Sequence, residues 1–177
     1  MTQKYSNLIA SIHWIHGALL AVLLLTGGLI LSNMPDTSEK IGSLQGHMLL
    51  GLLAGAIAVV RLILVMRAPE LAPLEVSRAR QQLITWNHRL IYLLIFVVAL
   101  SGMATAKLSG AGEIVFLGKE GELYAQMSTL AHNAKLLHTI STRLLMALIV
   151  MHVAGTVLYM IKTGDNVLRR VGFGRGA

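Results

Sequence analysis

The chain has 177 residues, of which 55% are hydrophobic and 13% are charged, and its formal net charge is +7. Because soluble globular proteins carry about a quarter charged residues, this composition excludes an ordinary soluble fold. The lack of cysteine excludes disulfides, thiolate metal sites, iron–sulfur clusters and covalently attached c-type haem. The length predicts a single domain over residues 1–177. The basic residues lie in short connections and near the C-terminus, without an aromatic and basic surface, so nucleic acid is not an expected partner.

Four apolar segments follow one another along the chain and predict four transmembrane helices. They span approximately residues 8–31, 44–66, 83–106 and 136–161. The first contains no charged residue, and the others contain one arginine each: Arg61, Arg89 and Arg143. Each segment has the roughly 20 residues that a helix needs to cross about 30 Å of hydrocarbon, and a helix satisfies its own backbone in lipid. We therefore expect an all-α fold, an integral membrane four-helix bundle in contact with membrane lipid.

The connection between the third and fourth segments is the longest. It runs from Lys107 to about residue 135 and contains Gly110, Gly112, Gly118 and Gly121. We expect a short interfacial helix in its stretch from 120 to 132.

Lysines and arginines are distributed unevenly between the two sides of the predicted bundle. One side carries Lys4, Arg67, Arg78, Arg80, Lys162, Arg169, Arg170 and Arg175. The other side carries Lys40, Lys107, Lys119 and Lys135, and five acidic residues dilute their charge. Because basic loops stay in the cytoplasm, both termini are predicted to be cytoplasmic and the long connection to lie outside. The expected location is the bacterial inner membrane.

Six of the seven histidines lie within the predicted spans, and His132 lies outside them. The six are His13, His16, His47, His88, His138 and His152. Ionisable side chains are costly in a membrane and are candidates for a functional site. A hydrogen bond between neighbouring helices explains one such histidine equally well, but six in one small bundle favour a site.

The depths of these histidines divide them into two layers. His138 and His152 lie fourteen residues apart on one helix, which is about 21 Å along its axis and on nearly the same face. His47 belongs to the outer layer with His138, whereas His13, His16 and His88 belong to the inner layer with His152. A small residue lies one turn after each of four histidines, at Gly17, Gly51, Thr142 and Thr156. A flat cofactor lying against a helix needs a small residue at that place, whereas His16 is followed by Leu20 and His88 by Tyr92. This spacing favours the pairs His13–His152 and His47–His138, although ordinary helix packing also explains the two glycines.

Two histidines from different helices in each layer indicate haem. They are too few for a closed tetrahedral zinc site. Haem needs only two axial ligands because the porphyrin supplies four nitrogens, and ligation by two histidines leaves no open position on the iron, which suits electron transfer.

An ordered set of motifs resembles the bacterial cytochrome b561 family over essentially the whole chain. The set comprises Ser11-Ile12-His13-Trp14, then His47 and Arg61, then Asn87-His88-Arg89-Leu90-Ile91-Tyr92, and finally Lys135 with His138 and His152. The resemblance implies a four-helix membrane bundle with two b-type haems, whose ligands fall on His13, His47, His138 and His152. His16 and His132 are not part of the family pattern.

The resemblance also implies exchange of electrons with a membrane quinone. Because the chain is short, it is similar to the stand-alone members such as superoxide oxidase, which oxidises superoxide outside and reduces ubiquinone in the membrane. One alternative is a cytochrome b subunit that links a dehydrogenase or hydrogenase to the quinone pool. The other is a transporter or structural membrane protein without haem, whose histidines serve protons or zinc.

Four charged residues are candidates for a role beside the haems. Arg61 and Arg89 lie toward the cytoplasmic side, where each either binds a haem propionate or extends to the lipid headgroups. Arg143 lies deeper, and an outer-haem propionate or an anion is its expected partner. Lys135, one turn before His138, is expected to attract an anionic donor such as superoxide.

Overall fold

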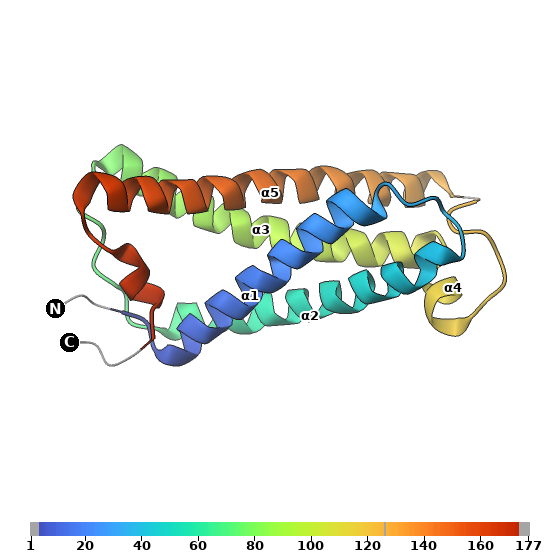
Figure 1. The fold of residues 1–177 in the computed structure, drawn as a ribbon, viewed down its shortest axis with the longest axis horizontal. Helices are drawn as coiled ribbons and strands as arrows, with labels where there is room; N and C mark the ends of the chain where they lie inside the picture. Colours follow the sequence, from blue (N-terminus) through green and yellow to red (C-terminus); the bar gives the residue numbers. More distant parts are fainter. Residues whose placement is uncertain (1–3, 126, 174–177) are drawn as a thin grey trace.

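Four long helices form the body of the molecule in the computed structural model, which describes residues 4–125 and 127–173 (Figure 1). They are α1 (Asn7–Leu25), continued by the π-helical segment η1 (Thr26–Leu31), then α2 (Glu39–Arg67), α3 (Arg78–Leu108) and α5 (Thr129–Thr163). The helix α4 (Ala111–Leu117) and the 3₁₀ helix η2 (Val167–Val171) are short. All four long helices are long and apolar enough to cross a membrane. The expected all-α membrane four-helix bundle is confirmed.

The long helices continue beyond the apolar segments that predict them. The helix α2 begins at Glu39 rather than near residue 44, and α5 begins at Thr129 rather than near 136. Hydropathy marks the part of a helix that lies in lipid, whereas its end depends on local capping. Ser77 and Ser128 cap α3 and α5 by accepting hydrogen bonds from the backbone N–H groups of Arg80 and Ala131.

The prediction of a short helix between residues 120 and 132 is wrong. The helix in this connection is α4, which lies earlier, and residues 129–132 are the first turn of α5. Gly110 and Gly118 bound α4 with left-handed φ angles of 73° and 63°, a conformation that glycine adopts without steric cost. The two glycines therefore decide where this helix begins and ends.

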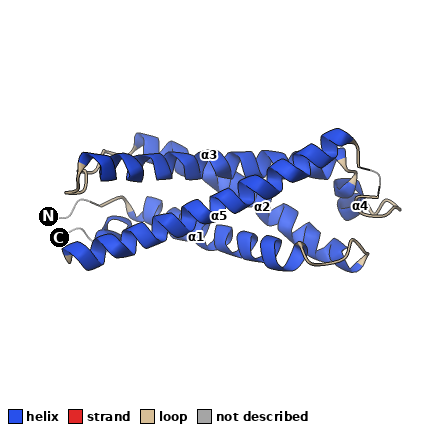
Figure 2. Ribbon diagram, turned by 90° about the horizontal axis from the view of Figure 1, so that it is seen from above, coloured by secondary structure: helices blue, strands red, loops and turns tan. Residues whose placement is uncertain are grey.

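The two ends of the bundle differ in what they carry. Both chain termini lie at one end, here called the terminal end, together with the connection between α2 and α3 (Figure 1). The opposite end, here called the loop end, carries the connection between α1 and α2 and the helix α4. The helices α3 and α5 run side by side, while α1 crosses α2 obliquely (Figures 1 and 2). At the terminal end, the Trp14 indole donates a hydrogen bond to the Val171 carbonyl, which attaches η2 to α1.

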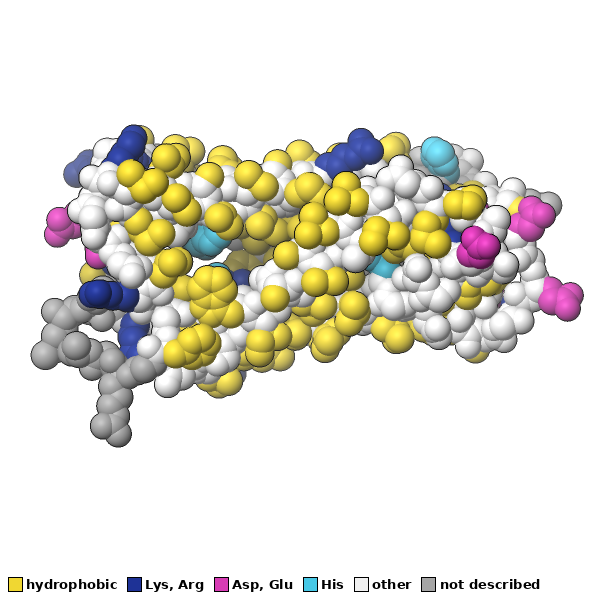
Figure 3. Space-filling model, viewed as in Figure 1, with side chains coloured by type: hydrophobic (Ala, Val, Ile, Leu, Met, Phe, Trp, Pro, Cys, Tyr) yellow, Lys and Arg dark blue, Asp and Glu magenta, His cyan; other side chains and the backbone are white. Residues whose placement is uncertain are grey.

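Two clusters of buried apolar residues form the core of the bundle. The cluster at mid-bundle contains Leu20, Leu23, Leu24, Ala54, Ala58, Ile95 and Leu145. The cluster at the loop end holds α4 in place and contains Leu31, Leu44, Ala111, Val115 and Leu123. Many other large apolar side chains point outward, and they cover the middle of the molecule while the acidic groups gather at its ends (Figure 3). This distribution is the one that lipid requires.

Candidate functional site

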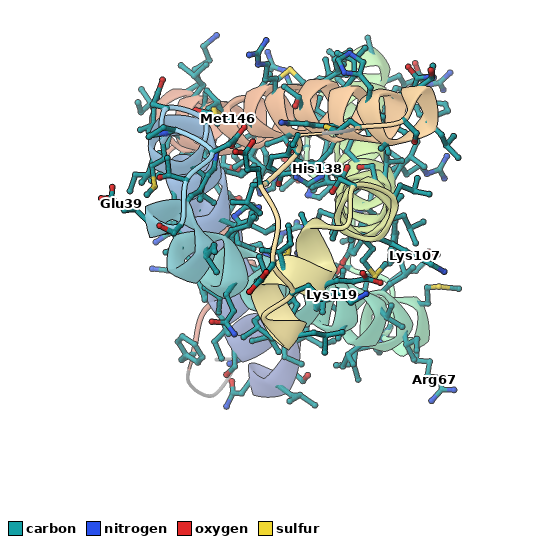
Figure 4. The ribbon with its side chains drawn as sticks, turned by 90° about the vertical axis from the view of Figure 1, so that its right-hand side faces the viewer. Glu39, Arg67, Lys107, Lys119, His138 and Met146 are labelled. Atoms are coloured by element: carbon teal, nitrogen blue, oxygen red, sulfur yellow. The ribbon has the colours of Figure 1, made fainter. Side chains whose placement is uncertain are left out.

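The predicted outer pair of histidines meets inside the bundle near the loop end. His47 comes from α2 and His138 from α5, and both side chains are half-buried. Their ring centroids are 6.4 Å apart and their ring planes are at 90°. Figure 4 looks onto the loop end and shows His138 beneath α5, on the side that faces the other helices.

The separation of these two rings can be compared with that of two axial ligands. Imidazoles on opposite sides of one metal would hold it at about 2.0 Å, and each ring centre lies about 1.2 Å behind its nitrogen, so the centroids would be about 6.4 Å apart. The 6.4 Å between His47 and His138 matches this value. The separation of the two rings would therefore allow both histidines to hold one haem iron between them.

The hydrogen bonds of His138 favour the same assignment. Its Nδ1 lies 2.9 Å from the carbonyl oxygen of Val98 and 3.4 Å from Ser101 Oγ. Because a carbonyl only accepts, Nδ1 carries the hydrogen and donates it, which leaves the lone pair of Nε2 free to bind a metal. A histidine ligand usually donates its second ring N–H in this way.

Two glycines lie against the outer pair from neighbouring helices. A Cβ at Gly27 would come within 2.9 Å of His47 Cε1, and a Cβ at Gly102 within 3.0 Å of His138 Cε1. Sequence spacing singles out Gly17, one turn after His13 of the inner layer, and Gly51, one turn after His47, and a Cβ added at either would meet nothing within 4 Å. Close helix packing therefore does not explain Gly17 and Gly51. The contacts of Gly27 and Gly102 are between helices, so no sequence interval reveals them.

The inner layer gathers three histidines from three helices. The rings of His88 and His152 are 4.9 Å apart at 83°, which is too close for opposite sides of one iron. The Nδ1 of His88 donates to the carbonyl of Ile84 on its own helix. His13, on α1, interacts electrostatically with both His88 and His152. Histidine side chains are visible in a hollow of the face shown in Figure 3, nearer the terminal end.

Arg61 turns into the bundle toward this layer. Its Nη2 donates to His13 Nδ1 at 2.7 Å, and its guanidinium lies over the Tyr92 ring at 5.4 Å. Its Nε is buried and makes no hydrogen bond within the described residues. Arg61 therefore does not extend to the headgroups. In this arrangement His13 Nδ1 accepts a hydrogen bond, so the ring proton lies on Nε2 and has to move to Nδ1 before Nε2 can bind iron.

His16 lies fully inside the bundle, with 0% of its surface exposed. Neither ring nitrogen makes a hydrogen bond of standard geometry with the described residues. Arg61 and the backbone of Ala54 on α2 lie near it. The sequence places His16 in the inner layer without a role, and its tight burial assigns it to the packing between α1 and α2.

The structure does not bring Arg89 or Arg143 into either layer. Arg89 is exposed and stacks on Trp86 of its own helix, with the guanidinium 5.6 Å from the ring centroid. Arg143 is exposed as well, and its five-residue offset from His138 places it about 140° away around α5. Neither guanidinium faces the histidine pairs, because helix phase points both away from the interior.

Lys135 remains close to the outer pair. It is half-buried one turn before His138, and its Nζ lies 3.9 Å from the centre of the Tyr124 ring. Burial, with a smaller contribution from Asp36, raises the pKa of Tyr124, so its ring stays neutral and attracts the ammonium group. Tyr124 has a left-handed φ of 63°, which is rare for residues other than glycine. His132 is exposed in the first turn of α5 and is remote from the inner layer.

A membrane-spanning helical bundle that pairs histidines from different helices is the arrangement expected of a membrane b-type cytochrome. The family model described as prokaryotic cytochrome b561 matches residues 4–174, and the chain belongs to this family. Membership establishes membrane electron transfer on haem b as its general activity. A comparison with curated proteins gave no match, and neither did a comparison with solved structures.

Proposed function

We propose that this protein carries electrons on two b-type haems from a donor at the loop end to ubiquinone in the membrane, and that the donor is superoxide. The 6.4 Å separation of His47 and His138, together with the Val98 hydrogen bond, carries the proposal. These two features support a haem bound near the loop end, which is the end that we propose a soluble donor reaches. Haem b supplies the one-electron carrier between donor and quinone.

His13 and His152 are the proposed ligands of the second haem, on the side of the terminal end. Arg61 supports this assignment, because its guanidinium lies inside the bundle beside His13 with a buried and unpaired Nε. A fork of this kind suits a propionate carboxylate. Binding a carboxylate would also release His13 Nδ1 from Arg61, so that Nδ1 could take the ring proton and leave Nε2 free. Arg89 stacks at the periphery and is assigned to the headgroup region.

The local charge of Lys135 at the loop end favours a small anion as donor. Lys119 is paired with Glu113 at 2.6 Å, and Lys40 is paired with Asp36 at 2.8 Å. Within the described residues, Lys135 makes no salt bridge and is held by a neutral ring. Its charge is therefore available one turn from His138, and an anion would be attracted to this place.

The proposed reaction is balanced by two superoxide ions for each quinone. Each superoxide loses one electron and leaves as oxygen, and one ubiquinone gains two electrons and two protons to become ubiquinol. Two histidine ligands leave no open position on the iron. Superoxide therefore binds to the protein surface near Lys135 and not to the metal.

The test is to give purified protein a superoxide pulse in the presence of ubiquinone while haem absorbance and quinol are followed. We expect rapid haem reduction and one quinol for two superoxide ions consumed. A result in which superoxide leaves the haems oxidised, while quinol reduces them, would contradict the proposed donor.

One observation favours the alternative of an electron-transfer subunit. Arg143 is exposed on α5 within the apolar span, and a charged side chain facing lipid is costly. A partner helix with a carboxylate would remove that cost. A dehydrogenase that copurifies after mild detergent extraction, and is lost from Arg143→Leu, would establish this alternative.

A further inference from the structure

We propose that Gly27 and Gly102 are positioning residues, whose backbones fix the orientation of the two outer imidazoles and thereby set the redox potential of the outer haem. The inference rests on the proposed function in one respect, namely that His47 and His138 are the axial ligands. It adds two residues that touch neither iron nor substrate.

The contacts of the two glycines with the two rings are equivalent. A Cβ at Gly27 would lie 2.9 Å from Cε1, 3.5 Å from Nδ1 and 3.8 Å from Nε2 of His47. A Cβ at Gly102 would lie 3.0 Å from Cε1, 3.2 Å from Nδ1 and 3.9 Å from Nε2 of His138. In both cases the ring edge between the two nitrogens lies directly against a helix backbone, so a methyl group would displace the imidazole itself.

Gly27 affects the orientation of its histidine ring more than Gly102 does, because no hydrogen bond restrains the His47 ring within the described residues. The Nδ1 of His47 is buried and makes no hydrogen bond within the described residues. Packing alone therefore decides how this ring is turned. Gly27 lies in the π-helical segment η1, where the Ser32 N–H donates to the Gly27 carbonyl at 3.1 Å. Short π-helical segments often occur at functional sites, and this one fixes the backbone that the ring touches.

His138 lies against α3 at two points. The Val98 carbonyl accepts the hydrogen bond of Nδ1, and Gly102, one turn further along, leaves the ring edge space that a Cβ would fill. A Cβ at Gly102 would push on the Nδ1 side and weaken the hydrogen bond to Val98. Hydrogen bonding to an axial ligand and the orientation of that ligand both change the potential of a haem iron.

The chain provides matched controls for both substitutions. Gly28 is the next residue in the same π-helical segment, and a Cβ there would meet only Met146 Cε at 3.8 Å, which is an ordinary contact. Gly55 faces α3 from α2, and a Cβ there would meet Ala99 Cβ at 3.4 Å and no histidine. These two report the effect of a methyl group on helix packing alone.

The experiment compares Gly27→Ala and Gly102→Ala with Gly28→Ala and Gly55→Ala in the purified holoprotein. The readouts are haem content, a redox titration that resolves two waves, and the low-spin electron paramagnetic resonance signals. We expect each of the first two variants to shift one wave and its low-spin signal, or to lose one haem, while the other haem is unchanged. The two controls should resemble the wild type.

Three outcomes would overturn the inference: potentials and signals of Gly27→Ala and Gly102→Ala equal to those of the wild type, equal changes at both haems, or equal changes in the controls. His47→Ala separates this failure from failure of the proposed function. If His47→Ala keeps both haems, the ligand assignment itself is wrong. If His47→Ala loses one haem while both glycine variants behave as wild type, only the positioning role fails.

Discussion

Reversal of the charge at Lys135 is the perturbation that tests the proposed electron entry most directly. Lys135 and His138 are three residues apart on α5, so their Cβ atoms are about 5–6 Å apart. A superoxide ion about 8 Å from the ammonium group gains about 0.5 kcal/mol in water-like surroundings. Lys135→Glu replaces this attraction by an equal repulsion, which changes the interaction by about 1 kcal/mol. The rate of haem reduction should therefore fall about fivefold at low salt.

The dependence of the haem reduction rate on salt concentration tests the same electrostatic attraction. At 0.15 M ionic strength the Debye length is about 8 Å, so the interaction falls to roughly a third and the difference in rate to about twofold. The assay is stopped-flow haem reduction after a superoxide pulse, at several salt concentrations. The haem spectrum should not change, because Lys135 contacts Tyr124 and not the histidine rings.

Lys162→Glu is the matched control. Lys162 lies in the last turn of the same helix, so this variant has the same change in net charge at the opposite end of the bundle. If Lys135→Glu and Lys162→Glu slow the reaction equally, or if neither slows it, the charge of Lys135 does not guide the donor.

The remaining predictions concern cofactor content, ligands and topology. The purified protein should contain two non-covalent haem b groups per chain, both low-spin, and a pyridine haemochrome assay that finds one would contradict this. His47→Ala or His138→Ala should remove only the outer haem, and His13→Ala or His152→Ala only the inner one, as spectra of the purified variants will show. A reporter fused to the C-terminus should be active in the cytoplasm only, and one inserted after Gly121 outside only. Reversed activities would place each haem on the opposite side.

The surroundings of the two layers explain why the outer site is the better defined. His138 has a hydrogen-bonded Nδ1 and lies at axial distance from His47. In the inner layer, Arg61 binds the nitrogen of His13 whose proton state decides ligation. Arg61→Leu should therefore weaken retention of the inner haem if the guanidinium binds a propionate, and haem quantification on that variant measures it.

Hydropathy and helix periodicity in the sequence alone determine the four membrane-spanning helices and the depth of the histidines along them. Four apolar segments of sufficient length have only one stable form in lipid, which is the helix, and this prediction is confirmed. The register of an isolated helix also places His138 and His152 on one face at different depths, since both lie on one continuous helix. The family resemblance, which rests on the order of the histidine motifs, is confirmed over residues 4–174.

Contacts between helices are decided only by the tertiary structure. The glycines that lie against the outer rings are Gly27 and Gly102, on other helices than His47 and His138, so no interval within one helix reveals them. Arg61 and Arg89 look alike in sequence, but one turns inward to His13 and the other stacks on Trp86 at the surface. The physical reason is that hydropathy and periodicity fix depth and phase along one helix. The crossing of α1 over α2 and the pairing of α3 with α5 depend instead on packing between residues far apart in the chain.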